Sequence, residues 1–204
     1  RTNYAMFNSS LIEPRSVEWQ NRTNPSEVRM QYLSYDGSGN ILSYAKDRNP
    51  LMSYIWDYQN TYPIAEITNG DSANIAYTSF EANGKGNWTI TSSLRDTLKS
   101  ITGRRSYNLL NGAVSKSGLQ TSRSYIVSYW TTNASAYSSI TGNKSGYPIQ
   151  GKTIKGWTLF MHKITGVTSV SVSGSGNIDE LRLYPDSAQM TTYTYSPLVG
   201  MTSQ

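Results

Sequence analysis

Cysteine is absent from the 204 residues of the chain, and histidine occurs once, at His162. Without cysteine there can be no disulfide, no thiolate metal site and no cysteine nucleophile, and one histidine is too few for a two-histidine zinc site within the chain. These absences exclude many classes of enzyme. They also leave the redox compartment undetermined.

Long apolar runs and clusters of like charge are missing as well. No run approaches the roughly 20 apolar residues that a membrane-spanning helix needs, and the chain lacks the pattern of a signal peptide. The net charge is +5, but the 18 lysines and arginines are dispersed, with the densest groups at Arg104-Arg105 and at Lys152 and Lys155. Because phosphate recognition usually needs a clustered basic face, we expect no nucleic-acid partner and no membrane span.

Helical periodicity is rare, whereas short alternations of polar and apolar residues recur between turn-forming residues. The aromatic residues are 16 Tyr and 5 Trp against 3 Phe, which suits sheets with one face in water. This pattern predicts an all-β protein. The expected strands are residues 16–19, 28–35, 41–45, 53–56, 64–68, 88–91, 107–110, 125–131, 157–163, 169–173 and 178–184. One helical turn is expected at 94–101, where Leu94, Leu98 and Ile101 fall on one side.

Three segments differ in the style of their strands. Residues 1–71 carry short, tyrosine-rich strands, residues 72–185 carry longer strands and more glycine, and residues 186–204 return to the first style. Residues 191–195 alternate like a strand that Ser196-Pro197 would end. A tail that resembles the head suggests a middle domain inserted into a continuing repeat array. The start without methionine suggests a segment of a longer protein.

The sequence Tyr-Asp-Gly-Ser-Gly-Asn-Ile at residues 35–41 predicts a tight hairpin. Asp36 can accept hydrogen bonds from the backbone amides that follow it, and Gly39 can take a positive φ. This sequence resembles the signature of YD repeats, also called RHS repeats. Residues 53–65 resemble a phrase of the same group, and residues 193–201 resemble a repeat start with Ser196 in place of the motif aspartate. The resemblance implies a larger YD-repeat chain on a bacterial cell surface.

The middle segment contains three further phrases: Ser-Phe-Glu and Gly-Asn-Trp within residues 79–88, Tyr-Ile-Val-Ser-Tyr-Trp at 125–130, and Gly-Asn-Ile-Asp-Glu-Leu-Arg-Leu-Tyr at 176–184. Together they resemble the jelly-roll, galactose-binding-like carbohydrate-binding modules of secreted bacterial proteins. The resemblance implies a jelly-roll β-sandwich flanked by short β-hairpins of YD-repeat type. It also implies that the first and last phrases lie near one another.

The same resemblance brings Glu81 and Asp179 together at strand ends, where members of the group often hold a structural Ca²⁺. Carboxylate and carbonyl oxygens suit this hard cation. The residues also allow another interpretation, in which Asp179 and Glu180 cap a strand or pair with Arg182 and Glu81 meets a lysine.

A polysaccharide is the partner that these aromatic residues suggest, because sugar rings stack on Trp and Tyr while sugar hydroxyls bond to amides and charged groups. Alternation along residues 125–130 places Trp130 and Tyr129 on opposite faces, so one of the two is expected in the core. Trp88 is also expected inside. The candidate ligand-binding residues are Trp130, Tyr137, Tyr147 and Trp157, with Tyr129 as a further candidate.

No motif predicts catalysis. The chain has 13 acidic residues, but no motif places a pair of them at the spacing of a glycoside hydrolase. His162 would share a strand face with Phe160 and Ile164 and has no identifiable serine partner, which favours a structural role. The sequence Gly-Ser-Gly-Asn at 174–177 indicates a turn rather than a dinucleotide site. We therefore expect that the protein is not an enzyme.

The leading hypothesis is a non-catalytic module, extracellular or on the bacterial cell surface, that binds a polysaccharide weakly through a β-sandwich inserted in a YD-repeat array. One alternative is a structural or protein-interaction spacer of a large RHS-type protein. Another is a glycan hydrolase whose carboxylates no motif marks. Exposed aromatic residues along a groove would favour binding, buried ones the structural role, and two carboxylates across a deep cleft the hydrolase.

Overall fold

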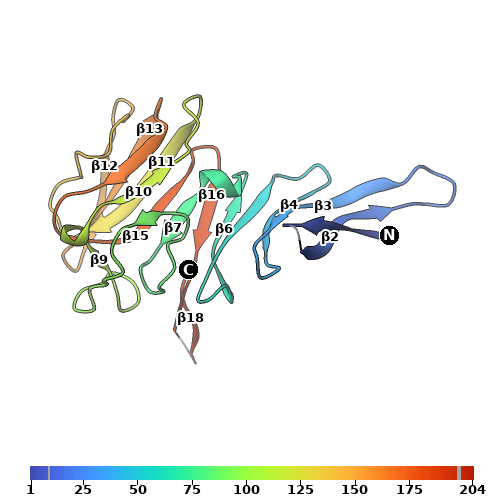
Figure 1. Ribbon diagram of the computed structural model, residues 1–204. Coiled ribbons are helices and arrows are strands. Elements are labelled where there is room, and N and C mark those ends of the chain that lie inside the picture. Colours follow the sequence, from blue (N-terminus) through green and yellow to red (C-terminus); the bar gives the residue numbers. More distant parts are fainter. Residues whose placement is uncertain (9, 197–198) are drawn as a thin grey trace.

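The computed structural model describes residues 1–8, 10–196 and 199–204. Within them the regular secondary structure consists of antiparallel β-strands and two 3-10 turns, η1 (Ser72–Asn74) and η2 (Leu109–Asn111). Figure 1 shows a β-sandwich at one side and an open sheet that extends away from it. The all-β prediction is confirmed.

The open sheet has seven strands in the order β1-β2-β3-β4-β5-β6-β16. Their bounds are β1 (Thr2–Phe7), β2 (Leu11–Trp19), β3 (Glu27–Tyr35), β4 (Ile41–Lys46), β5 (Met52–Asp57), β6 (Tyr62–Thr68) and β16 (Gln189–Thr192). The first six form a meander, and β16 pairs with β6 with Thr192 opposite Ala65. The tail thus returns to the head sheet as its sequence style suggested, but through residues 189–192 rather than 191–195.

The hairpin between β3 and β4 has the geometry predicted from its residues. The Oδ1 atom of Asp36 accepts hydrogen bonds from the backbone amides of Ser38 at 2.8 Å and Asn40 at 2.9 Å. Gly39 has a φ of +86°, a conformation that costs glycine little. Tyr35 is buried and its hydroxyl donates to the carbonyl of Pro14. The contacts of Asp36 hold the turn of the hairpin, and the Tyr35 hydroxyl joins β3 to β2.

The sandwich consists of a three-stranded sheet, β14-β10-β8, packed on a larger sheet, β12-β13-β11-β15-β7, in which β9 also pairs with β15. The strands are β7 (Ala76–Thr78), β8 (Thr89–Ile90), β9 (Tyr107–Asn108), β10 (Val114–Ser117), β11 (Ser124–Thr131), β12 (Ile149–Ile154), β13 (Trp157–Thr165), β14 (Ser169–Val172) and β15 (Asn177–Pro185). Strands β11 and β14 alternate between buried and less buried residues, because one face of each lies against the other sheet, whereas no residue of the edge strand β12 is buried.

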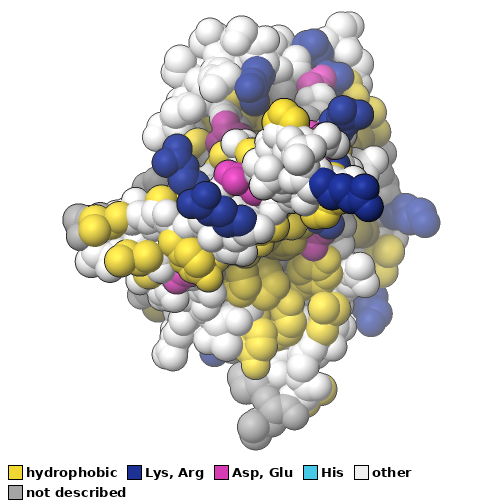
Figure 2. Space-filling view, turned by 90° about the vertical axis from the view of Figure 1, so that its right-hand side faces the viewer, with side chains coloured by type: hydrophobic (Ala, Val, Ile, Leu, Met, Phe, Trp, Pro, Cys, Tyr) yellow, Lys and Arg dark blue, Asp and Glu magenta, His cyan; other side chains and the backbone are white. Residues whose placement is uncertain are grey.

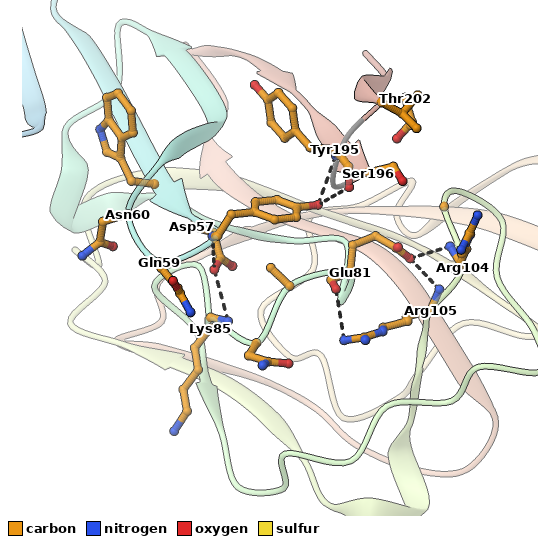
Figure 3. Close-up of a pocket in the computed structure, with 17 residues that line it drawn as sticks. Asp57, Gln59, Asn60, Glu81, Lys85, Arg104, Arg105, Tyr195, Ser196 and Thr202 are labelled. Atoms are coloured by element: carbon orange, nitrogen blue, oxygen red, sulfur yellow. Dashed lines mark hydrogen bonds between the residues drawn. The ribbon is translucent and has the colours of Figure 1, made fainter.

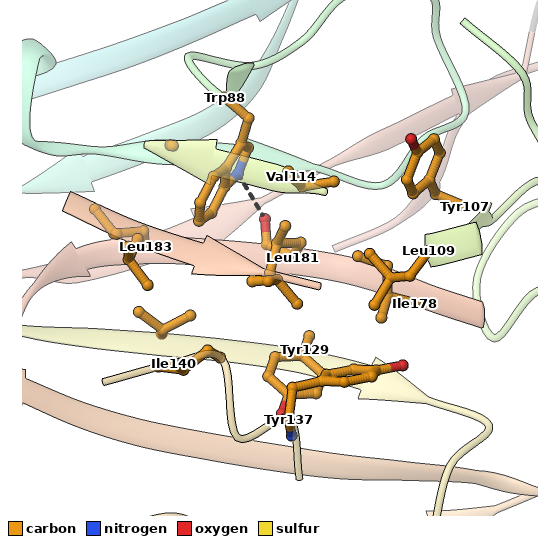
Figure 4. Close-up of a cluster of buried hydrophobic side chains, with 14 of the residues drawn as sticks. Trp88, Tyr107, Leu109, Val114, Tyr129, Tyr137, Ile140, Ile178, Leu181 and Leu183 are labelled. Atoms are coloured by element: carbon orange, nitrogen blue, oxygen red, sulfur yellow. Dashed lines mark hydrogen bonds between the residues drawn. The ribbon is translucent and has the colours of Figure 1, made fainter. Parts of the chain in front are cut away.

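The core of the sandwich lies between these two sheets (Figure 4). Tyr129, Leu181 and Leu183 are fully buried in it, so the face of β11 that carries Tyr129, and not the face that carries Trp130, lies in the core. Trp88 is 3% exposed and its indole Nε1 donates to the carbonyl of Leu181 at 3.4 Å, as expected for a buried indole.

Strand β15 departs from the predicted alternation. Asp179 and Glu180 are buried as well as Leu181, because the pairing of β11 with β15 shifts register between Ser128 and Trp130. At this irregularity Glu180 has a φ of +52°, which is uncommon for a residue other than glycine. The carboxylates of two consecutive residues, Asp179 and Glu180, are therefore both buried.

The helical turn expected at 94–101 is wrong. Asp96 instead forms an isolated antiparallel bridge with Ser106, and the side chains of Leu94 and Leu98 are exposed. With no apolar surface to cover, the short leucine pattern does not stabilise a helix, since isolated helical turns are unstable in water.

A second apolar cluster joins the open sheet to the sandwich. Ile64 and Ile67 of β6 pack there with Ile75 and with Tyr77 of β7. Arg182 of β15 donates to the Oγ1 atom of Thr192 at 2.8 Å, which adds a polar contact across the same junction. The chain then ends in a ribbon of β17 (Thr194–Ser196) and β18 (Gly200–Ser203), and the predicted stop at Pro197 lies outside the described residues.

Candidate functional site

Two of the four candidate stacking residues are buried. Tyr137 is 6% exposed, and its hydroxyl bonds to the Oγ1 atom of Thr131 at 2.8 Å and to the carbonyl of Ser175 at 3.0 Å. Trp157, the first residue of β13, is 4% exposed. Neither ring presents a face to solvent, and the same holds for Tyr129. In this arrangement these residues support the sandwich rather than offer a stacking platform.

The other two candidates, Trp130 and Tyr147, are half-buried and are not brought together. Trp130 lies opposite Leu159 of β13. Tyr147 precedes β12 near Lys163 of β13, because its amide donates to the carbonyl of Lys144, whose own amide donates to the carbonyl of Lys163. Leu159 and Lys163 are four residues apart on β13, which corresponds to about 13 Å along the strand. Trp130 and Tyr147 therefore lie beside different parts of β13. Each could contact a ligand, but they do not form one compact site.

The predicted metal residues are occupied by hydrogen-bond donors. The Oδ2 atom of Asp179 accepts from the backbone amides of Ile101 at 3.0 Å and Thr102 at 3.3 Å, and its Oδ1 atom accepts from the amide of Glu180. The Oε1 atom of Glu81 accepts from the amide of Arg104 at 2.7 Å. These oxygens are the atoms with which the two carboxylates would bind a cation, and backbone N–H groups already donate to them.

Glu180 is also satisfied without a metal. Its carboxylate accepts from the Tyr77 hydroxyl at 3.0 Å and the Thr102 hydroxyl at 2.6 Å, and it forms an ion pair with Arg182 at 2.9 Å. The pair with Arg182 is the alternative that the sequence left open. Within the described residues, no group of three or more histidine or acidic side chains is arranged to hold a metal ion. Both carboxylate oxygens of Asp179 and the Oε1 atom of Glu81 accept from backbone amides, which a Ca²⁺ ion would have to displace.

Burial sets the protonation of these carboxyl groups. It raises the pKa of Asp179 well above its ordinary value, with the neighbouring charge of Glu180 adding to the effect, while backbone donors oppose it. Burial also raises the pKa of Glu81, against the two backbone amides that favour its charged form. The loop at residues 101–105 is thus held to the sandwich by its own amide groups.

A groove lies at the junction between the open sheet and the sandwich and has a volume of about 1250 Å³. We call it the junction groove. It is lined by the turn at residues 56–60, the loop at 81–85, residues 103–105 and four residues of the tail, Tyr195, Ser196, Val199 and Thr202. Ligand pockets in proteins typically measure about 300–1,000 Å³, so this groove has room for more than one sugar ring.

The groove combines amides, cations and carboxylates (Figure 3). Gln59 and Asn60 lie toward one end in this view, and Arg104 and Arg105 toward the other. The guanidinium of Arg105 donates to the carbonyl of Glu81 at 3.3 Å. Among the described residues, neither Arg104 nor the exposed Lys85 forms an ion pair. Their donors can therefore reach a ligand.

Asp57 and Glu81 are the two carboxylates of the groove. Asp57 is 8% exposed, and its Oδ1 atom accepts from the amides of Tyr58 at 2.7 Å and Gly84 at 3.2 Å. Burial raises its pKa, although these amides favour the charged form. Backbone amides donate to the Oδ1 atom of Asp57 and to the Oε1 atom of Glu81. The second oxygen of each carboxylate remains available to accept a hydrogen bond from a ligand.

Tyrosines fix the tail against the rim of the groove. Tyr195 stacks on Tyr62 with ring centroids 4.8 Å apart and meets Tyr58 edge-on at 5.5 Å. The Tyr58 hydroxyl donates to the carbonyl of Tyr195 at 3.0 Å and accepts from its amide at 3.1 Å. These contacts join residues more than a hundred positions apart, so the groove exists only because the tail returns.

His162 lies away from the groove, in the core of the sandwich. It is 1% exposed, with Nε2 3.1 Å from the Tyr129 hydroxyl and Nδ1 2.9 Å from the Oδ1 atom of Asn143. Burial lowers its pKa to about 4. The predicted structural placement beside Phe160 and Ile164 is confirmed, since both are buried too.

Comparison with protein-family models, curated proteins and solved structures found no match for this chain. Over the residues that the structure describes, no helix has both the length and the apolar character needed to cross a membrane.

Two segments that line the groove have distinctive sequences. Residues 57–60 fall within the phrase at 53–65, and Arg104-Arg105 is one of the two densest basic groups in the chain. Nothing in the sequence shows that these segments meet, because they belong to different sheets and the tail completes the groove. The groove was therefore not predicted, and three of the five aromatic candidates, Tyr129, Tyr137 and Trp157, are buried.

Proposed function

We propose that the chain is a non-catalytic module that binds a polysaccharide weakly in the junction groove. The observation that carries the proposal is the lining of one open groove. It combines side-chain amides, lysine and arginine side chains that form no ion pair in the described part of the chain, and the edge of an aromatic cluster. Sugars are bound by such combinations, with rings against aromatic groups and hydroxyls on polar ones. The sequence resemblances support an extracellular or cell-surface setting within a larger YD-repeat chain.

Weak binding follows from the exposure of the groove. Each sugar hydroxyl that bonds to Gln59 or Asn60 first gives up water, so a neutral hydrogen bond contributes only about 0.5–1.5 kcal/mol. Bonds to Arg104 or Lys85 contribute about 1.5–3 kcal/mol each, because these donors are charged. Several copies of the module on one surface would raise the apparent affinity by avidity.

The test is titration of a panel of plant, host and bacterial glycans, followed by Arg104→Ala and Gln59→Ala. Both side chains are exposed, and Arg104→Ala keeps the backbone amide that Glu81 accepts from, so both variants should fold. Trp130→Ala serves as the control, because Trp130 lies on the sandwich and does not line the groove; this variant should bind the glycan as the natural chain does. We expect Arg104→Ala to weaken binding about tenfold, as the loss of a charged hydrogen bond predicts.

Other results would favour the alternatives. Loss of binding in Trp130→Ala or Tyr147→Ala alone would place the site on the outer face of the sandwich. Absence of binding to every glycan at millimolar concentration would favour the structural or protein-interaction spacer.

A glycan hydrolase is the second candidate, because Asp57 and Glu81 line the same groove and both have a raised pKa. A raised pKa suits a general acid. Against it, each carboxylate has one oxygen held by backbone amides. Incubation with any glycan that binds, followed by measurement of new reducing ends, tests this. Release of reducing ends that Glu81→Gln abolishes would replace the binding proposal with the hydrolase.

A further inference from the structure

The charges of the junction groove are unequally available to a ligand. Its described lining carries three cationic side chains, Lys85, Arg104 and Arg105, and two carboxylates, Asp57 and Glu81. By number these charges nearly balance. They differ in how much of each is already bound within the protein, and this difference decides which charge a ligand meets.

The two carboxylates are covered by backbone. Each accepts hydrogen bonds from two backbone amides. A Cβ on Gly84 would overlap the carboxyl group of Asp57. A Cβ on Gly103, which has a φ of +59°, would overlap that of Glu81. Because N–H groups that donate to a carboxylate stabilise its charge, they offset part of the negative charge that faces the groove.

The cations Lys85 and Arg104 are in the opposite situation. Both are exposed, and within the described residues neither forms an ion pair. The backbone amide of Arg104 donates to Glu81 at 2.7 Å, so the main chain of this residue is held in place while its guanidinium extends from it. The charge that a ligand meets in the groove is therefore mainly positive.

These two exposed cations do not lie at one point. In Figure 3 Lys85 lies on the same side as Asp57 and Gln59, whereas Arg104 lies beyond Glu81. The groove between them has a volume of about 1250 Å³, which is above the usual range of about 300–1,000 Å³ for a ligand pocket. A ligand that pairs with both cations needs negative charges on more than one of its units.

We propose that the polysaccharide bound in the junction groove is acidic and carries uronate carboxylates on more than one of its sugars. This inference rests on the proposed function, because it names the class of glycan for the same site. One carboxylate pairs with the planar guanidinium of Arg104, whose geometry matches it with two parallel hydrogen bonds. Another pairs with the ammonium of Lys85, and the sugar hydroxyls bond to the side-chain amides.

Basic side chains outside the groove require a control. Seen from the side of the open sheet, lysine and arginine side chains occupy more of the surface than acidic ones do (Figure 2). The net charge of +5 will itself attract a polyanion. Lys152 and Lys155 are exposed and do not line the groove. Replacing both with Gln removes as many charges as the double variant of the site, Lys85→Gln with Arg104→Gln.

The test is calorimetric titration of oligosaccharides of polygalacturonate, alginate and hyaluronan, each beside its own methyl ester. Esterification removes the charges and keeps the sugar rings. We expect at least one acid to bind at least about tenfold more tightly than its ester, as a charged hydrogen bond exceeds a neutral one, and to weaken as salt is added. The double variant of the site should lose this preference for the acid, and the control double variant should keep it.

The outcomes separate this inference from the proposed function. A natural chain that binds neutral glycans or the esters as tightly as the acids would overturn the inference and leave the proposed function standing. Absence of binding to every glycan, acidic or neutral, would overturn both. Equal loss of acid binding in the two double variants would also overturn the inference, because the net charge would then be responsible. So would a single-stranded DNA with the same number of charges that binds as tightly as the acid.

Discussion

The buried His162 makes the stability of the sandwich depend on pH in a way that can be traced to one side chain. In the folded chain its pKa falls to about 4 because burial disfavours the charged ring. In the unfolded chain a histidine has a pKa of about 6.5. Below pH 6.5 the unfolded chain takes up a proton that the folded chain does not, so the stability that the neutral ring provides is lost as the pH falls from 6.5 toward 4.

The magnitude follows from the two pKa values. A fall from 6.5 to about 4 corresponds to about 3 kcal/mol, since one pKa unit is worth 1.36 kcal/mol. That is a large share of the roughly 5–15 kcal/mol by which a domain is stable. Asp57, Glu81 and Asp179 act in the opposite direction, because their raised pKa values favour the folded chain as the pH falls. The histidine effect must therefore be isolated by a variant.

The assay is urea unfolding followed by tryptophan fluorescence at about pH 7 and about pH 4, for the natural chain and for His162→Gln. We expect the natural chain to lose about 3 kcal/mol more than the variant between the two conditions. Because the chain has a single histidine, its imidazole signals in NMR report the folded pKa without assignment. Equal pH dependence in the two proteins, or a native imidazole that titrates near 6.5, would refute the reasoning.

Four further outcomes are expected. Trp88→Ala removes a buried indole and should lower the free energy of unfolding by about 3–5 kcal/mol in urea. Gly86→Ala should destabilise more than Trp88→Ala in the same assay, because a Cβ there would overlap the carbonyl oxygen of Tyr77 at a φ of +54°. Tyr58→Phe should cost about 1–2 kcal/mol and speed amide exchange at Tyr195, since two hydrogen bonds are lost; unchanged exchange would contradict this role. The melting temperature should be the same in calcium and in chelator, whereas a rise with calcium would restore the metal site.

Local chemistry made much of the fold predictable. Strand β11 could be predicted from alternation because it has one buried face, with Tyr125, Val127 and Tyr129, whereas the edge strand β12 has no buried residue and was not predicted. The hairpin at residues 35–41 could be read because Asp36 and Gly39 act within their own turn. Both features depend on residues close together in the sequence.

Features that depend on distant contacts were missed. The alternation of β15 breaks at Asp179, because the pairing with β11 shifts there. Tyr137 could not be placed in the core from its sequence, since its hydroxyl is satisfied by Ser175, 38 residues away. The junction groove depends on four segments that only the fold unites. Sequence patterns report burial within a strand, and they do not report which loops meet.

The most direct test of the binding proposal is to map, by NMR, the backbone amides that respond to the glycan with the highest affinity in the panel. The account predicts saturable shifts at residues 57–60, 81–85 and 103–105, with few changes elsewhere. Shifts confined to the surroundings of Trp130 and Tyr147, or no shifts with any glycan, would contradict it.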